Sequence, residues 1–298
     1  MKAPYSYQYQ NVYNSSVQPN IVHSHNTALF KYNVKYFLQK AISVFKFSGL
    51  PGGWAQNYFK YVLFGYGYIS VFNTDRYGVV AQECTLGDRI SLYKQPQRAI
   101  VTNPIFRNTI ELKLEENGQL IKLQPDYSGV MDIVTTYADL KTLALETAGV
   151  NMLNSKLSWL FFAENKTGAE SFKKMYDQIA SGYPAVVLDR KLLNEDGSVN
   201  WQMFTQNVGQ NYITDKVLND IATIDNMFNT SIGIPNANTQ KRERLITDEV
   251  NKRDMETQSL VELWLETMRD DIKKVNEMFN LNISVDYRFK DTEKEIIE

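Results

Sequence analysis

The chain has 298 residues, of which 43% are hydrophobic and 22% charged, and these proportions are typical of a folded globular protein. A net charge of −2 excludes a polycation that coats nucleic acid over its whole surface, so any contact with DNA must be local. The single cysteine excludes an intramolecular disulfide and a cysteine-based metal cluster, and the absence of any apolar run near ~20 residues excludes a membrane-spanning helix.

The first quarter of the chain contains no acidic residue before Asp75 and is rich in tyrosine. Tyrosine combines a large ring with a polar hydroxyl and is enriched at protein interfaces. We therefore predict that residues 5–13 form a flexible arm, whereas residues 58–68 fit either an interface or an aromatic core. His23 and His25 could bind a metal, but the absence of any nearby carboxylate favours polar residues of the arm.

The first half of the chain predicts two helices followed by a small β module. Apolar residues recur at helical spacing over 29–47, with lysines on the other face, and a Gly-Pro-rich turn follows. Cys84 falls on one of the predicted strands, where a small buried residue is favoured over a nucleophile. An Asn-Gly turn at residues 117–118 predicts that the last two strands form a hairpin. The second helix is expected at 56–64 and the strands at 65–72, 79–84, 99–102, 109–114 and 120–123.

The second half is dominated by long helical patterns with a small insert between the first two. We therefore predict an α+β fold that is predominantly α, in which two long helices flank a β-α-β insert. The helices are expected at 129–157, 211–229 and 254–279, the strands of the insert at 159–163 and 185–188 around a helix at 168–180, and a terminal strand at 282–289.

A polar, basic loop at residues 236–250, NANTQKRERLITDEV, connects the last two of these helices. It contains Lys241, Arg242 and Arg244 within four residues. Lys241 and Arg242 could bind phosphates without reading bases. Taken alone, the loop fits a solvated connection between helices equally well.

Three residues at the end of this loop, Thr247, Asp248 and Glu249, are expected at the start of the next helix. They could form a catalytic carboxylate site, but this position favours capping and interaction with the helix dipole. No phosphate-binding GxxxxGK[ST], GxSxG or HExxH motif occurs, and Gly65-Tyr66-Gly67 is not completed to GxGxxG. We therefore predict a scaffold that is not an enzyme and has no cofactor or metal.

The string NAN-x-x-K-x-ER-x-x-TDEV, which begins at Asn236, resembles the portal protein of small short-tailed phages with protein-primed genomes. This family is also called the upper collar or head–tail connector. The order of elements matches along nearly the whole chain. Further matches lie at Gly233-Ile234, Leu50-Pro51, residues 65–72, Asn276-Glu277, Asn280-Leu281-Asn282 and Tyr287-Arg288.

The resemblance implies a homo-oligomer, a dodecameric ring at one capsid vertex of the virion, between head and tail. Such a ring is the conduit for DNA packaging and ejection and the attachment point of the tail. The implied partners are double-stranded phage DNA, a packaging ATPase, the major capsid and scaffolding proteins and a lower collar or tail protein, with assembly in the host cytoplasm and no membrane. The alternative from a different class is a collar or tail adaptor with a purely protein–protein role.

The resemblance also implies an organisation into arm and wing (1–128), stem helix (129–157), clip (158–205), second stem helix (206–232), tunnel loop (233–250) and C-terminal wing or crown (251–298). The implied DNA-channel contacts are Lys216, Lys241 and Arg242, and the residues that support the loop are Asn236, Asn238, Arg244, Thr247, Asp248 and Glu249. A second channel lysine of the family falls near Thr205. The relatives have a basic arm associated with a packaging RNA, whereas here only Lys2 precedes Lys31, which argues against RNA binding.

Overall fold

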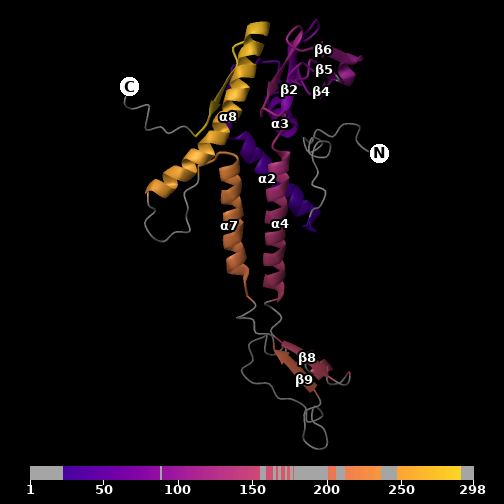
Figure 1. Cartoon of the computed structure of the whole chain (residues 1–298). Coiled ribbons are helices and arrows are strands. Elements are labelled where there is room, and N and C mark those ends of the chain that lie inside the picture. The colour runs from indigo at the N-terminus through magenta and orange to yellow at the C-terminus, as the bar shows by residue number, and fades with distance from the viewer. Residues whose placement is uncertain are drawn as a thin grey trace, which may run out of the picture. The chain divides into compact units, whose positions relative to one another are not determined.

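The computed structural model describes residues 23–87, 89–154, 159–163, parts of 166–177, 201–205, 212–235 and 247–289 (Figure 1). The fold is mixed α+β, and about half of the described residues are helical, so the prediction of a predominantly α chain is met only in part. The chain divides into two compact units, one formed by residues 1–143 and 221–298 and the other by residues 144–220. Among the described helices, none is long and apolar enough to cross a membrane.

In the first unit, helix α2 (Thr27–Ile42) is capped by Asn26, whose side chain accepts a hydrogen bond from the Leu29 N–H. The helix ends earlier than predicted, because residues Phe45–Ser48 form strand β1. β1 pairs antiparallel with β10 (Ser284–Tyr287), close to the other end of the sequence. The predicted helix at 29–47 was therefore wrong over its last residues, since its periodicity carried no information about a partner strand so far away. The terminal strand predicted at 282–289 is confirmed.

Helix α3 (Gln56–Tyr66) and the strands that follow it form the β module. One sheet has the order β3-β2-β7, and a second sheet has the order β4-β5-β6. The strands are β2 (Tyr68–Thr74), β3 (Gly78–Gln82), β4 (Thr85–Leu86), β5 (Arg98–Val101), β6 (Ile110–Lys113) and β7 (Gly118–Lys122), with a short 3-10 helix at Pro104–Phe106.

The hairpin predicted at the Asn-Gly turn does not form, because β6 and β7 belong to different sheets. β7 pairs with β2 over residues 118–122, and β6 pairs with β5. A two-residue hairpin turn would need positive φ at Asn117 and Gly118, but at this connection it is Glu115 that has a positive φ, of 69°. The Asn117 side chain instead accepts a hydrogen bond from the Lys113 N–H at 2.8 Å. Asn117 therefore shapes a wider connection that leads β7 onto the other sheet.

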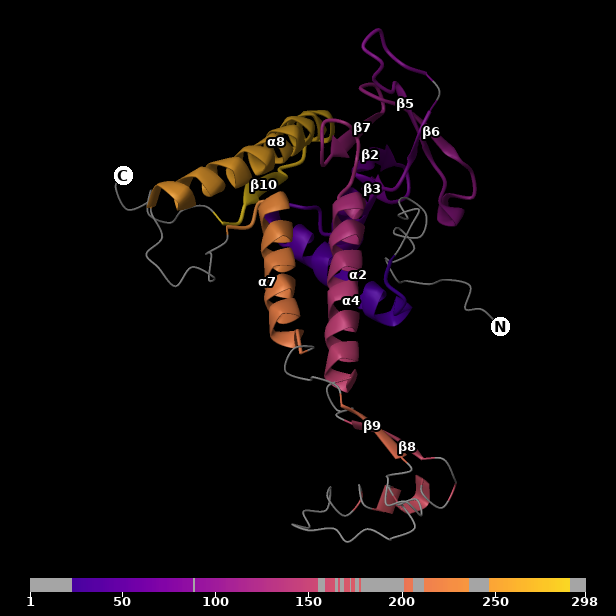
Figure 2. The same ribbon diagram turned by 60° about the horizontal axis from the view of Figure 1, so that its bottom comes forward.

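The main core lies where α2, α3 and β2 meet α8 (Thr247–Phe279) and parts of α4 (Met131–Asn154) and α7 (Thr214–Ser231). Figures 1 and 2 show α2 crossing α4 and α7. Tyr58, Tyr61 and Tyr66 pack against this core, so the structure favours the aromatic-core interpretation of residues 58–68. The three long helices predicted in the second half of the chain are confirmed, although α8 begins earlier than the predicted 254.

In the second unit, β8 (Trp159–Ala163) pairs antiparallel with β9 (Trp201–Thr205). The strand predicted at 159–163 is confirmed, but β9 was not predicted. Those residues between 166 and 177 that the structure describes are helical, in agreement with the predicted helix at 168–180. The strand predicted at 185–188 lies outside the described residues.

A close backbone crossing at Gly67 fixes where α4 begins. Gly67 ends α3 with a φ of 94°, and its carbonyl accepts a hydrogen bond from the Leu123 N–H at 2.7 Å. A Cβ at this position would lie 2.2 Å from the carbonyl carbon of Ser128. The Val130 N–H next to this crossing donates to the Phe64 carbonyl at 2.9 Å, so the first turn of α4 is tied to the end of α3.

We predict that Gly67→Ala destabilises the first unit, because alanine meets both the positive φ and the Ser128 backbone. The positive φ alone should cost about 1–3 kcal/mol, and the steric contact adds to this cost. The midpoint of urea unfolding, followed by circular dichroism, measures the effect. Gly53→Ala is the matched control, because a Cβ there has no atom within 4 Å. Equal midpoints for the two variants would contradict the prediction.

Candidate functional site

The basic loop between α7 and α8 is the site that the sequence singled out, and the structure describes the segments on both sides of it. Lys241, Arg242 and Arg244, together with Asn236 and Asn238, lie within 236–246, outside the described residues. Their predicted roles therefore stay predictions. The described residues show how the chain enters and leaves the loop.

The chain enters the loop from a tightly closed helix end. Gly233 has a φ of 83°, the Ile234 N–H donates to the Asn229 carbonyl at 2.8 Å, and the Gly233 N–H donates to the Thr230 carbonyl at 3.3 Å. These two bonds form a Schellman motif, which ends a helix at a glycine with left-handed backbone. The Tyr287 hydroxyl also donates a hydrogen bond to the Gly233 carbonyl. The direction in which the chain leaves α7 is therefore fixed by backbone hydrogen bonds and by the C-terminal strand β10.

The chain leaves the loop into helix α8, which begins at Thr247. Thr247, Asp248 and Glu249 thus lie in the first helical turn, as the sequence predicted. Carboxylates in a first turn interact favourably with the helix dipole. Their side chains lie outside the described part of the structure, so the capping role stays a prediction.

An ion pair between Lys141 of α4 and Asp225 of α7 holds the C-terminal half of α7 in place. The Lys141 Nζ lies 2.8 Å from both carboxylate oxygens of Asp225. Only 13% of the lysine side chain and 25% of the aspartate side chain are exposed. The same ammonium group lies 4.4 Å from the centre of the Tyr36 ring of α2, within the range of a cation–π interaction. One partly buried charge therefore joins three helices.

Aromatic packing extends this contact toward the loop. The ring of Phe228 on α7 is completely buried, and its centroid lies 4.2 Å from that of Phe37 on α2 and 5.6 Å from that of Tyr137 on α4. Phe228 is followed by the Schellman motif within one helical turn. We refer to Lys141, Asp225, Tyr36, Phe37 and Phe228 as the helix clamp. The helix clamp fixes the end of α7 from which the basic loop starts.

A family model described as Phage Connector (GP10) matches residues 9–292, which is nearly the whole chain. The chain belongs to this family. It is therefore a phage portal protein, a head–tail connector that is part of the portal ring in the neck of the virion, and it is a structural protein rather than an enzyme.

Solved structures of phage-related particles resemble the connector at low sequence identity. A chain of the portal and tail of native bacteriophage P68 has a TM-score of 0.48 and 16% identity, with 92% of this chain and 90% of that chain covered. A chain of the virion of a native gene transfer agent particle has a TM-score of 0.42 and 11% identity, with 97% and 91% covered. A chain of the neck of the empty gene transfer agent particle has a TM-score of 0.42 and 12% identity, with 94% and 88% covered.

Lys216, the third predicted DNA contact of the connector, is an exposed residue in the first turn of α7. Asn151 of α4 caps this turn, because its Oδ1 accepts hydrogen bonds from the Ile213 N–H at 3.0 Å and the Thr214 hydroxyl at 2.8 Å. A cation near the N-terminal end of a helix is unfavourable by ~0.3–1 kcal/mol, so helix stability does not explain a lysine there. Thr205, where a second family lysine falls, is the last residue of β9.

His23 is held against α4 by a carboxylate that lies far away in the sequence. The Nδ1 of His23 lies 3.0 Å from the Asp139 carboxylate, which also accepts hydrogen bonds from the N–H groups of His23 and Ser24 at 3.0 and 2.9 Å. Burial acts to raise the pKa of Asp139, but these hydrogen bonds outweigh it and hold the pKa below its usual range. Within the described residues, no group of three or more His, Cys, Asp and Glu could hold a metal.

Sequence reasoning placed Cys84 on a strand, whereas the structure places it after β3, in a half-buried position. Burial raises the pKa of its thiol to about 11, so the thiolate form that a nucleophile requires is scarce at neutral pH. The helix clamp was missed altogether. A lysine in a predicted amphipathic helix gives no signal of its partner.

We predict that Lys141→Met destabilises the connector by about 1–3 kcal/mol, because it leaves the partly buried Asp225 carboxylate without its cation. Urea unfolding gives the overall change, and hydrogen exchange of the α7 amides locates it. The double variant Lys141→Met/Asp225→Leu should recover much of the loss, since no unpaired charge remains.

The matched control is Lys113→Met, whose partner Glu116 is 67% exposed and 3.1 Å away. Loss of such an exposed pair should change stability by less than about 1 kcal/mol. A Lys141→Met variant as stable as this control would show that the helix clamp does not hold α7.

Proposed function

We propose that the connector closes into a dodecamer around a channel for double-stranded DNA, and that its basic loop touches the DNA in that channel. The observation that carries this proposal is the anchoring of the loop. Three cations follow a helix end that is fixed by the Schellman motif, by Tyr287 and by the helix clamp. A fixed starting point lets each copy present its cations in the same place, which a ring needs in order to surround a duplex.

The charge of the chain supports weak contact with DNA. Tight binding would oppose sliding, because each neutralised phosphate adds to the affinity. Lys216 is the single cation of α7, which also contains Asp215, Asp220 and Asp225. With a net charge of −2 overall, attraction to DNA is confined to a few positions, namely Lys216, Lys241 and Arg242.

We assign the parts of the chain by the same proposal. Residues 129–157 and 206–232 are the stem helices, 158–205 the clip and 233–250 the tunnel loop, with 1–128 and 251–298 as arm, wing and crown. The packaging ATPase and the tail protein then meet the clip, whereas capsid and scaffolding proteins meet the wing. Motion of the DNA is driven by the separate ATPase.

Electron microscopy of the purified protein tests the ring. We expect twelve-fold rings with a central hole wider than a DNA duplex. Averaged top views give the symmetry, and mass measurement of the particles in solution gives the number of copies. A stable monomer at micromolar concentration, or a ring whose hole is too narrow for a duplex, would contradict the proposal.

Replacing Lys241 and Arg242 by Ala tests contact with DNA. We expect rings to assemble normally and heads to retain less packaged DNA, because the cations that meet phosphate in the channel are removed. The DNA content of purified heads is the measurement. Lys31→Ala/Lys35→Ala, which removes two exposed lysines of α2, is the matched control and should retain DNA normally. Normal retention in the loop variant together with lost tail attachment would favour the adaptor role.

A further inference from the structure

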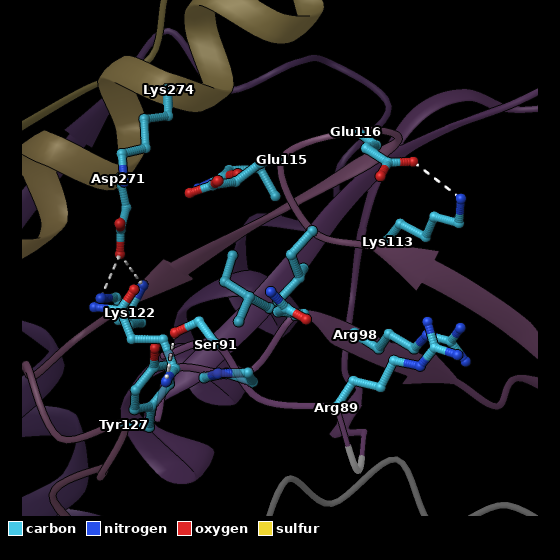
Figure 3. Close-up of a pocket in the computed structure, with 16 residues that line it drawn as sticks. Arg89, Ser91, Arg98, Lys113, Glu115, Glu116, Lys122, Tyr127, Asp271 and Lys274 are labelled. Carbon is cyan, nitrogen blue, oxygen red and sulfur yellow. Dashed lines mark hydrogen bonds and ion pairs between the residues drawn. The ribbon is translucent and has the colours of Figure 1, made fainter. Parts of the chain in front are cut away.

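A basic cleft of about 570 Å³ lies between the β module and α8 (Figure 3). The cleft receives side chains from the β4–β5 connection, from β5, β6 and β7, and from α8. Its five cations outnumber its three carboxylates, Glu115, Glu116 and Asp271. The cations are Arg89, Arg98, Lys113, Lys122 and Lys274.

Part of this positive charge is neutralised within the chain, and part is not. Arg89 and Lys274 are exposed, and among the described residues neither forms an ion pair, although the charge of Lys274 acts through space on the Asp271 carboxylate. The other cations pair as Arg98 with Glu111, Lys113 with Glu116 and Lys122 with Asp271. The cleft therefore suits an acidic ligand that brings carboxylates to Arg89 and Lys274.

An exposed apolar tip stands beside the cleft. Residues 90–96 form a tight turn, in which the Ser91 N–H donates to the Gln95 carbonyl at 2.8 Å and Ile90 bridges to Pro96. At its tip, Leu92 is 90% and Tyr93 81% exposed, although both are large and apolar. A ligand that joins carboxylates to aliphatic side chains would match the cleft and the tip together.

The chain contains such a segment at residues 290–298, KDTEKEIIE, which lies outside the described residues. It has four acidic residues, two lysines and the pair Ile296-Ile297. Nine residues can reach roughly 30 Å when extended. Most of this segment lies beyond residue 292, where the match to the family ends.

The described strand that precedes this segment, β10, lies on the face of α8 that points away from the cleft. Strand β10 is held by Arg269, whose guanidinium donates to Asp286, and by Asn276, which bonds to the backbone of Ile283. The cleft is lined by Asp271 and Lys274. Residues in an α-helix are ~100° apart, so these two lie roughly 140–160° around α8 from Arg269 and Asn276. Figure 2 shows β10 alongside α8, and β7 contacts α8 where the Lys122 N–H donates to the Asp271 carboxylate.

We propose that residues 290–298 of one copy dock in the basic cleft of the neighbouring copy. Complementary surfaces on opposite sides of one subunit are what a head-to-tail ring interface requires. Glu293 and Glu295 meet Arg89 and Lys274, and Ile296-Ile297 covers Leu92 and Tyr93 of the neighbour. The inference rests on the proposed ring and names a contact that links its subunits.

Disulfide trapping in assembled rings tests this contact. The variant Lys274→Cys/Glu293→Cys, made with Cys84→Ala, is oxidised gently and run on a denaturing gel without reductant. We expect a ladder of covalent dimers and higher oligomers, because each copy is linked to the next. Lys273→Cys/Glu293→Cys is the matched control, since Lys273 is also exposed but lies on the β10 side of α8. The ladder should be clearly weaker in this control, because residue 273 lies ~100° around the helix from residue 274 and faces away from the cleft.

Charge reversal gives a second measurement on the trapped pair. Arg89→Glu in the trapping variant should weaken the ladder, and adding Glu295→Lys should restore it, because opposite charges face each other again. Raising the salt concentration should diminish both effects.

The outcomes separate this inference from the proposed ring. Intact rings without a disulfide would contradict the proposed docking but not the proposed ring. The cleft would then be available to an acidic segment of another protein. Monomers that carry only an internal disulfide show that the segment occupies its own cleft, which also overturns the docking. If no rings form even without the substitutions, the proposed ring itself fails.

Discussion

The ion pair between Lys141 and Asp225 is the contact that fixes the helix from which the basic loop starts. Burying one charge without the other would be costly, so the pair forms only where α4, α7 and α2 come together. Once α7 is fixed there, Phe228 fills the space between the helices and the Schellman motif at Gly233 follows directly. The loop therefore starts from a rigid point, although its own residues are polar and unsuited to a core.

Contacts between segments that are distant in the sequence also build the rest of the first unit. β1 pairs with β10, His23 and Ser24 bind Asp139, and the backbone at Gly67 meets that of Ser128. Each of these contacts holds a chain segment that local propensity would not fix by itself. Together they hold the first unit in one compact body.

The connector has two groups of cations, those of the basic loop and those of the basic cleft. The loop cations follow one another in the sequence, as suits contact with a uniform phosphate backbone. The cleft cations come from separate strands and from α8, which favours a ligand of defined shape and sequence. A chain with a small net negative charge therefore has two separate groups of cations, one for which we propose DNA and one for which we propose a protein segment.

The long helices, the basic loop and the family could be predicted from the amino-acid sequence, because helical periodicity and short motifs are local. The sequence did not determine which strands pair. Residues 45–47 belong to a predicted helix yet lie in β1, and the Asn-Gly turn leads β7 to β2 rather than to β6. The helix clamp and the basic cleft could not be predicted in this way, because Lys141 and Asp225 form a pair, and Arg89 and Lys274 line one cleft, only after folding. Ion pairs and clefts depend on distances in space, which a pattern along the chain does not encode.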